Sequence, residues 1–168
     1  LGSHSIALNT SRALGEAYKA GAIRRQDEDL TFQYSTPDGR VLDGIVEYLG
    51  AVNDLVLRVD PTTGAAALQN FSANVAFNIK GYEISSASGS LNVAGWTSFQ
   101  DTGAGGPNWF EANPSANFLA ELSLLGSKNF TSGVQVLLGN ILAGGATKDL
   151  VLRFATTDGE VLEGTVEY

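Results

Sequence analysis

Residues 149–168 of the chain read DLVLRFATTDGEVLEGTVEY, and residues 29–48 read DLTFQYSTPDGRVLDGIVEY. Eleven of the 20 aligned positions are identical, at a constant offset of 120 residues. Internal repetition of this kind marks a chain built from copies of one supersecondary unit. The two stretches are therefore expected to adopt the same local structure.

Each copy has the pattern of a β-hairpin. In the second copy, an apolar run at 150–154 is followed by Asp158-Gly159. This dipeptide favours a tight turn, because glycine tolerates positive φ and aspartate hydrogen-bonds to its own backbone. Residues 161–168 then alternate between two faces, as the residues of a strand do. Asp38-Gly39 holds the same place in the first copy.

The middle of the chain predicts more short strands. Residues 55–60 and 65–71 flank a Pro-Thr-Thr-Gly turn, and apolar residues recur at 75–79, 82–85 and 134–138. Residues 11–22 include Leu14, Ala17 and Tyr18 at helical spacing, but we expect a turn or a short helix at most there. The predicted fold is an all-β, antiparallel, immunoglobulin-like β-sandwich with at most short helical turns.

The repeat also divides the chain. Its similarity extends upstream with one gap, since residues 14–22 align with 138–146. Residues 1–48 are thus interpreted as the C-terminal part of one repeat, and residues 50–168 as a complete sandwich repeat. A piece as small as residues 1–48 cannot bury enough surface to fold alone. We expect it to pack on the next repeat, on a missing first part or on a neighbouring subunit, in cis or in trans.

Composition limits the function classes. The chain has no cysteine, so thiol nucleophiles, thiolate zinc sites and disulfides are excluded. A net charge of −8 disfavours nucleic acid, and without a long apolar run we expect no membrane insertion. The low charged fraction of 17% favours a secreted or cell-surface protein. Because the first residue is Leu1 rather than Met, we expect a removed leader or an excerpt of a longer chain.

The order of features after Val56 resembles a known family. A strand and turn lead to Asn70, then to Gly81-Tyr82-Glu83-Ile84 and Ser88-Gly89-Ser90-Leu91, and Gly133 precedes another strand before the closing hairpin. Over residues 51–168 this is similar to the immunoglobulin-like lamin-tail type of domain and to repeats of large secreted bacterial proteins. The resemblance implies a sandwich used for attachment or spacing, with no catalytic residues.

Few residues could carry catalysis. The single histidine, His4, excludes a histidine-dependent triad and a multi-histidine metal site, so no enzyme is predicted. Asp101, Glu111 and Glu121 could form a glycosidase pair, but acidic residues solvated on loops are the favoured interpretation. No cofactor is predicted. Calcium is left open as an alternative, with Asp27, Asp29 and Asp101 as its candidate ligands.

Aromatic residues give the second functional hypothesis. Tyr82, Trp96, Trp109 and Phe110 could form an exposed platform that stacks on sugar rings. The favoured interpretation is that Trp96 and Trp109 instead plug the end of the sandwich or pin the long loop to its core, because large aromatics are mostly buried in small domains.

The first hypothesis is a non-catalytic, extracellular, structural or adhesive repeat. Its partners would be further copies of the chain or neighbouring repeats, joined by strand addition into filaments or arrays. The alternative is a carbohydrate-binding module whose partner is a polysaccharide and whose platform surrounds Trp96 and Trp109.

Overall fold

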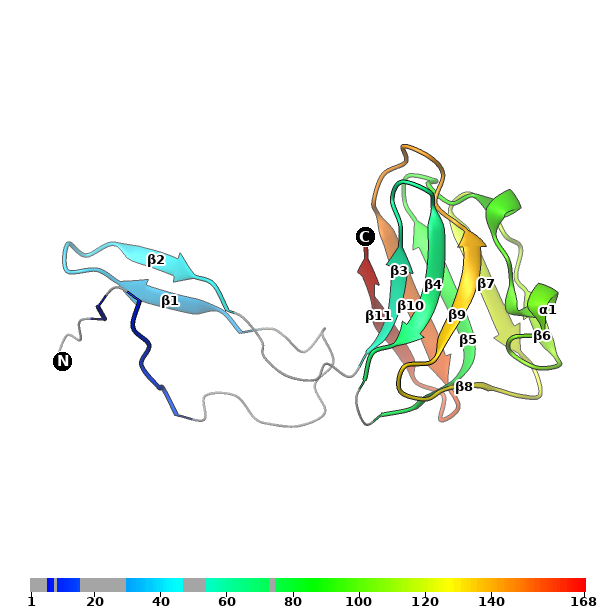
Figure 1. Cartoon of the computed structure of the whole chain (residues 1–168), viewed down its shortest axis with the longest axis horizontal. Coiled ribbons are helices and arrows are strands. Elements are labelled where there is room, and N and C mark those ends of the chain that lie inside the picture. Colours follow the sequence, from blue (N-terminus) through cyan, green and yellow to red (C-terminus); the bar gives the residue numbers. More distant parts are fainter. Residues whose placement is uncertain (1–5, 8, 16–29, 47–53, 73–74) are drawn as a thin grey trace.

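The computed structural model of the 168-residue chain describes residues 6–7, 9–15, 30–46, 54–72 and 75–168. These residues form an all-β protein with two separate sheets, one of two strands and one of nine (Figure 1). The predicted all-β fold is confirmed. Among the described residues, no helix is long and apolar enough to cross a membrane.

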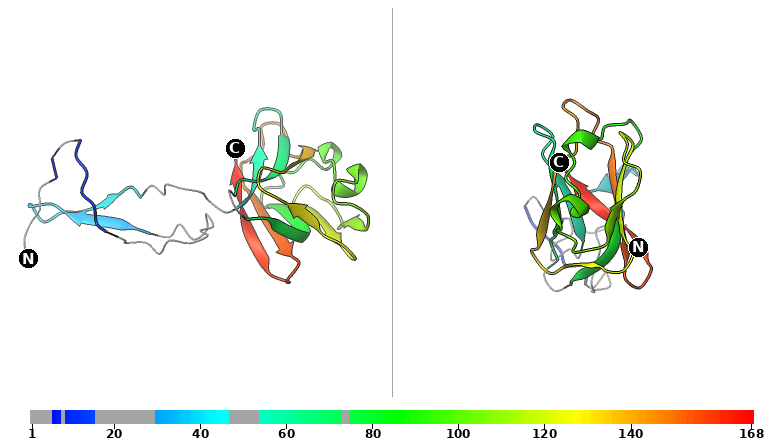
Figure 2. Two further views of the ribbon diagram at one scale, coloured as in Figure 1. Left: turned by 60° about the horizontal axis from the view of Figure 1, so that its bottom comes forward. Right: turned by 90° about the vertical axis from the view of Figure 1, so that its right-hand side faces the viewer.

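The larger sheet folds into a sandwich of two layers (Figure 2). One layer contains β6, β7, β5, β10 and β11 in that order, with β8 also paired to β5, and the other contains β3, β4 and β9. The strands are β3 (Leu55–Val59), β4 (Ala65–Asn70), β5 (Phe77–Ser86), β6 (Trp109–Glu111), β7 (Phe118–Ser123), β8 (Lys128–Phe130), β9 (Gln135–Asn140), β10 (Leu150–Thr156) and β11 (Val161–Glu167).

Strand β11 connects the two layers. Its first half pairs antiparallel with β10, and its second half pairs in parallel with β3, with Thr165 opposite Val56 and Glu167 opposite Arg58. Most strand pairs are antiparallel as predicted, whereas the sequence pattern did not indicate this parallel pair. A parallel pair needs a long crossover connection, and here residues 60–160 supply it.

The core lies between the layers. Its fully buried side chains are contributed by both layers, among them Leu55 and Leu57 from β3, Ile84 from β5, and Leu152 and Phe154 from β10. The strand predicted from the apolar run at 150–154 is confirmed, and it packs on the core through Leu150, Leu152 and Phe154 while Arg153 is exposed.

The two-stranded sheet is the first copy of the repeat. It consists of β1 (Phe32–Ser35) and β2 (Val41–Gly44), paired antiparallel with Phe32 opposite Gly44. The second copy has the equivalent register, with Leu152 opposite Gly164. No residue of 30–46 belongs to the sandwich core.

Two details of the fold differ from the predicted elements. Residues 77–79 and 82–85 of the two predicted runs belong to one ten-residue strand, β5, whose start pairs with β8 and whose remainder pairs with β10. The pairing with β10 includes a register shift between Ala155 and Thr156. The short helical turns that the prediction allowed are η2 (Val93–Gly95) and α1 (Phe99–Thr102), whose positions the sequence pattern did not indicate. Of the predicted turn or short helix at 11–22, residues 11–15 are described and contain no helix, and residues 16–22 lie outside the described part.

Gly164 allows β11 to lie close to β3. A Cβ atom at this position would stand 2.5 Å from the Leu55 carbonyl oxygen, which is backbone and cannot turn aside. We predict that Gly164→Ala lowers the free energy of unfolding by roughly 1–3 kcal/mol, the usual range for overpacking. Urea unfolding with Gly144→Ala as the matched control measures this, because nothing lies within 4 Å of a Cβ at Gly144. Equal stability of the two variants would contradict the proposed contact.

Candidate functional site

The predicted aromatic platform is not formed at the surface. Tyr82 and Trp109 are each 2% exposed and Trp96 is 8% exposed, so their ring faces are covered by protein. Of the four predicted residues, only Phe110 is open to solvent, at 47%. The expectation of an exposed platform is therefore corrected. Burial of these rings stabilises the fold, because each ring removes a large apolar area from water.

The buried rings form a cluster at the end of the sandwich. The ring centroid of Phe99, from α1, lies 4.9 Å from that of Tyr82 and 5.0 Å from that of Trp109. Trp109 Nε1 donates a hydrogen bond of 2.9 Å to the carbonyl oxygen of Gly105. This bond fastens the glycine-rich loop to the core, which is one of the two roles that the sequence favoured for this tryptophan.

A buried carboxylate lies at the centre of this cluster. Glu121 on β7 is 2% exposed and accepts three hydrogen bonds: from the Tyr82 hydroxyl at 2.5 Å, from the Phe99 amide at 2.7 Å and from the Gln100 amide at 2.8 Å. The two amides begin helix α1, whose first N–H groups have no partner inside the helix. Glu121 thus joins α1 to the sheet and satisfies donors that would otherwise be buried unpaired.

Burial decides the ionisation of this network. Loss of solvation raises the pKa of Glu121, while the hydrogen bonds from Tyr82, Phe99 and Gln100 oppose that effect only in part. Nearby Glu111, which lies opposite Glu121 on β6, also raises it. The pKa of Tyr82 is likewise raised by its burial and by the Glu121 charge.

The acidic candidates for chemistry have local structural roles. Asp101 closes a capping box with Ser98 at the start of α1, with bonds of 3.2 and 3.0 Å. Glu121 has both oxygens occupied by protein donors. The calcium candidates Asp27 and Asp29 lie outside the described residues. Within the part of the chain that the structure describes, no group of three or more His, Asp or Glu residues is placed to hold a metal ion.

A shallow groove crosses the outer face of the second layer. It encloses about 440 Å³ over Ala65 and Ala67, and the exposed Leu137 lies at one side. Arg58 and Glu167 lie at the other side as an ion pair 3.7 Å apart. Tyr168 also lines the groove, and its hydroxyl accepts a hydrogen bond from the Leu150 amide. These polar groups thus have partners within the protein.

A second surface of interest is an apolar face of the first hairpin, which is exposed although the same face of the second copy is buried. Leu30, Phe32 and Tyr34 are 41%, 45% and 45% exposed, whereas Leu150, Leu152 and Phe154 are 6%, 0% and 1% exposed. The Phe32 and Tyr34 rings stack with their centroids 5.9 Å apart. We call the side chains of Leu30, Phe32, Tyr34 and Leu42 the hairpin face.

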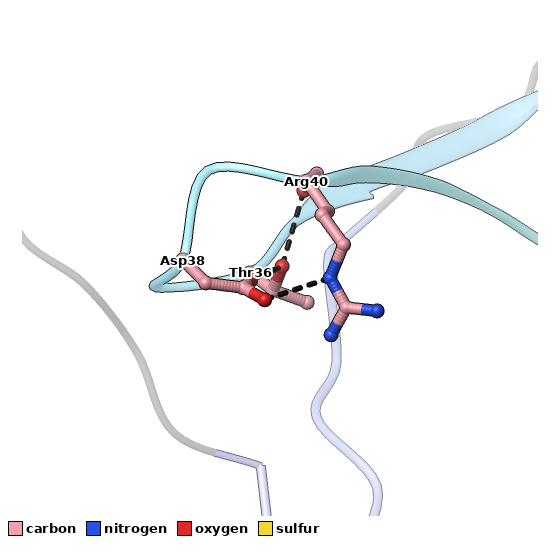
Figure 3. A network of polar contacts seen from close by, with 3 residues as sticks. All are labelled: Thr36, Asp38 and Arg40. Carbon is pink, nitrogen blue, oxygen red and sulfur yellow. Dashed lines mark hydrogen bonds and ion pairs between the residues drawn. The ribbon is translucent and has the colours of Figure 1, made fainter.

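The turn of this hairpin is well defined by its own side chains. Thr36 Oγ1 donates to Asp38, and Arg40 Nε donates to the other Asp38 oxygen at 2.7 Å (Figure 3). The bond from Thr36 lowers the pKa of Asp38, with a smaller contribution from Arg40. In the second copy, Thr156 donates in the same way to Asp158. Both copies therefore set their strand register through the same turn chemistry.

The fold and these contacts define a class, an all-β sandwich protein with an additional β-hairpin and short helical turns. Comparisons with known proteins do not narrow this class. No family model matches the chain, and neither the curated proteins nor the solved structures include a significant match to it.

Two features of the site have a signal in the sequence but were not predicted from it. The Ser98-x-x-Asp101 spacing is a capping-box signal for α1, and Glu121 alternates in phase with the apolar Leu119 of β7. The sequence did not indicate that the hairpin face is exposed, because the first copy has the same pattern of apolar and polar positions as the buried second copy.

The buried and exposed aromatics make a matched pair for testing. We predict that Trp109→Ala lowers the free energy of unfolding by roughly 3–5 kcal/mol, as removal of a buried ring does. Phe110→Ala on the same strand should change it by less than about 0.5 kcal/mol. Denaturant unfolding followed by circular dichroism measures both. Similar effects of the two substitutions would contradict the assigned burial.

Glu121 makes stability depend on pH. The pKa of Glu121 in the folded state is raised above its ordinary value of 4.5. The stabilisation that its protonation gives the folded state is therefore fully present below pH 4.5 and is lost as the pH rises through the folded-state pKa. Glu121→Gln removes this titration but loses an acceptor, so it should be less stable than the wild type. We predict that the difference in unfolding free energy between the wild type and Glu121→Gln narrows from pH 4 to pH 7, as measured by urea titrations. A difference that widens over this range would contradict the assigned shift in pKa.

Proposed function

We propose that the chain is a non-catalytic structural or adhesive repeat, in which hairpin 30–46 joins one β-sandwich to another by strand addition. The observation that carries this proposal is the hairpin face, in which Leu30, Phe32 and Tyr34 are exposed although their repeat counterparts are buried core residues. Strand addition uses the unpaired backbone groups of a hairpin edge together with its apolar side chains.

The energetics of the hairpin support an assembly role. A lone two-stranded hairpin is at best marginally stable in water, because it has no third strand or helix to cover it. If Leu30, Phe32 and Tyr34 became as buried as their counterparts, on the order of 200 Å² of apolar area would leave water. At about 25 cal/mol per Å² this favours docking by about 5 kcal/mol, before the entropy of association is subtracted.

The composition supports a secreted or cell-surface location for this repeat. The charged fraction is low and the surface is acidic, which fits the structural proteins outside the cell better than proteins that bind nucleic acid. The carbohydrate-binding alternative loses its basis, because Tyr82, Trp96 and Trp109 are buried and Phe110 alone does not form a platform.

The hairpin face should drive association of the chain. We predict that the wild-type chain associates as its concentration rises from nanomolar to micromolar, and that the double variant Phe32→Ser, Tyr34→Ser weakens this association at least about tenfold by removing apolar contact area. Analytical ultracentrifugation of both chains measures the change. The unfolding of the sandwich should be unaltered, because these side chains lie outside its core.

The matched control is Phe110→Ser with Leu122→Ser. These two residues lie opposite each other on the outer face of β6 and β7 and are 47% and 49% exposed, close to the exposure of Phe32 and Tyr34. This control should associate like the wild type. A wild-type chain that stays monomeric at every concentration would refute assembly through the hairpin, and so would a loss of association in the control alone.

A further inference from the structure

The closing hairpin of the sandwich occupies a well-defined slot. Strand β10 pairs antiparallel with β5, from Leu150 opposite Ser86 to Phe154 opposite Tyr82. Strand β11 pairs in parallel with β3 on the other side, with Val166 opposite Leu57. The slot is thus bounded by an antiparallel β5 and a parallel β3, and its floor is the buried core.

We infer that hairpin 30–46 is built to fill the same slot in a neighbouring repeat of the same type, one whose own closing hairpin is not in place. This assignment rests on the proposed function and names the partner of the hairpin face. The first support is that register, turn and face all match. Phe32 opposite Gly44 and Tyr34 opposite Leu42 correspond to Leu152 opposite Gly164 and Phe154 opposite Leu162.

Gly44 gives the second support. At the equivalent Gly164, a Cβ would meet the Leu55 carbonyl oxygen of β3 at 2.5 Å, so glycine is needed for the approach of a neighbouring backbone. At Gly44 the nearest atoms to that position are those of the Phe32 ring, a side chain that can turn aside. Gly164 has a neighbouring backbone that leaves no room for a side chain, whereas Gly44 has no such backbone beside it among the described residues. Docking in the slot would place the β3 strand of the neighbouring repeat against Gly44.

The outer face of the hairpin is compatible with the slot. In the filled slot, Arg153 lies between Glu83 and Glu163, at 3.7 and 3.8 Å. The first copy has Gln33 in its place, and the Gln33 amide donates to Asp43 at 2.7 Å. A docked Gln33 would face the Glu83 position as a neutral hydrogen-bond donor. The pairs that it replaces are exposed, and exposed ion pairs contribute little to stability.

In this chain β10 and β11 fill the slot and bury Leu152 and Phe154 almost completely. The hairpin of a second copy therefore enters the slot in a molecule whose own closing hairpin has left it. The partner is thus a second repeat of this type with an open slot between β5 and β3.

A hairpin graft tests this inference in the full chain. Residues 149–168 are replaced by the sequence of residues 29–48, so that the first copy is offered to the slot in place of the second. We expect the chimera to unfold in one cooperative transition, with its β5 and β3 amides protected from hydrogen exchange as in the wild type. A chimera without that protection would overturn the inference.

Two control chimeras keep the test specific. One carries Phe32→Ser and Tyr34→Ser within the graft, and the other carries Gly44→Val within it. Both should lose the hydrogen-exchange protection of the β3 amides. The first loses apolar contacts with the core, and in the second the valine side chain prevents the close approach of the β3 backbone. If both kept the protection of the parent chimera, the graft would not be seated in the slot and the inference would fail. Association of the intact chain is measured separately, so failure of the proposed function and failure of this partner assignment are distinguishable.

Discussion

The parallel pairing of β11 with β3 is the contact on which the sandwich depends. Strand β11 begins in one layer, beside β10, and ends in the other, beside β3. Gly164, near the change of partner, has no side chain to hold the Leu55 backbone away. The closing hairpin thus couples the layers and covers the core, because its inward side chains include the fully buried Leu152 and the almost fully buried Phe154.

The same constraint explains why the first copy of the hairpin is unusual. A β-hairpin with this pattern has one face made for a core, and in hairpin 30–46 that face is exposed. The turn bonds of Thr36, Asp38 and Arg40 define the register without any help from a sandwich. Local chemistry is therefore sufficient to shape the hairpin, whereas covering its apolar face needs a partner of matching geometry. This is the physical basis of the assembly role proposed for the chain.

The far end of the sandwich follows a different principle. There a carboxylate rather than an apolar side chain organises the packing, because α1 presents amides that need an acceptor. Glu121 supplies it and also binds the Tyr82 hydroxyl, while Trp109 fastens the adjoining loop. Burial of these groups together raises the pKa of Glu121. This buried carboxylate is thus a structural anchor.

The sequence by itself determined the repeat, the two hairpins and the all-β class, since turn residues such as Asp158-Gly159 and strand alternation act over a few neighbours. It favoured burial of Trp96 and Trp109, because large aromatics are mostly buried in small domains. It did not determine the parallel β11–β3 pair or the residues that cover these rings, because both depend on contacts between distant segments. The identical patterns of the two copies could not reveal that Phe154 is buried and Tyr34 exposed. Only the tertiary structure decided this, because burial depends on which strands lie on either side and not on the hairpin's own residues.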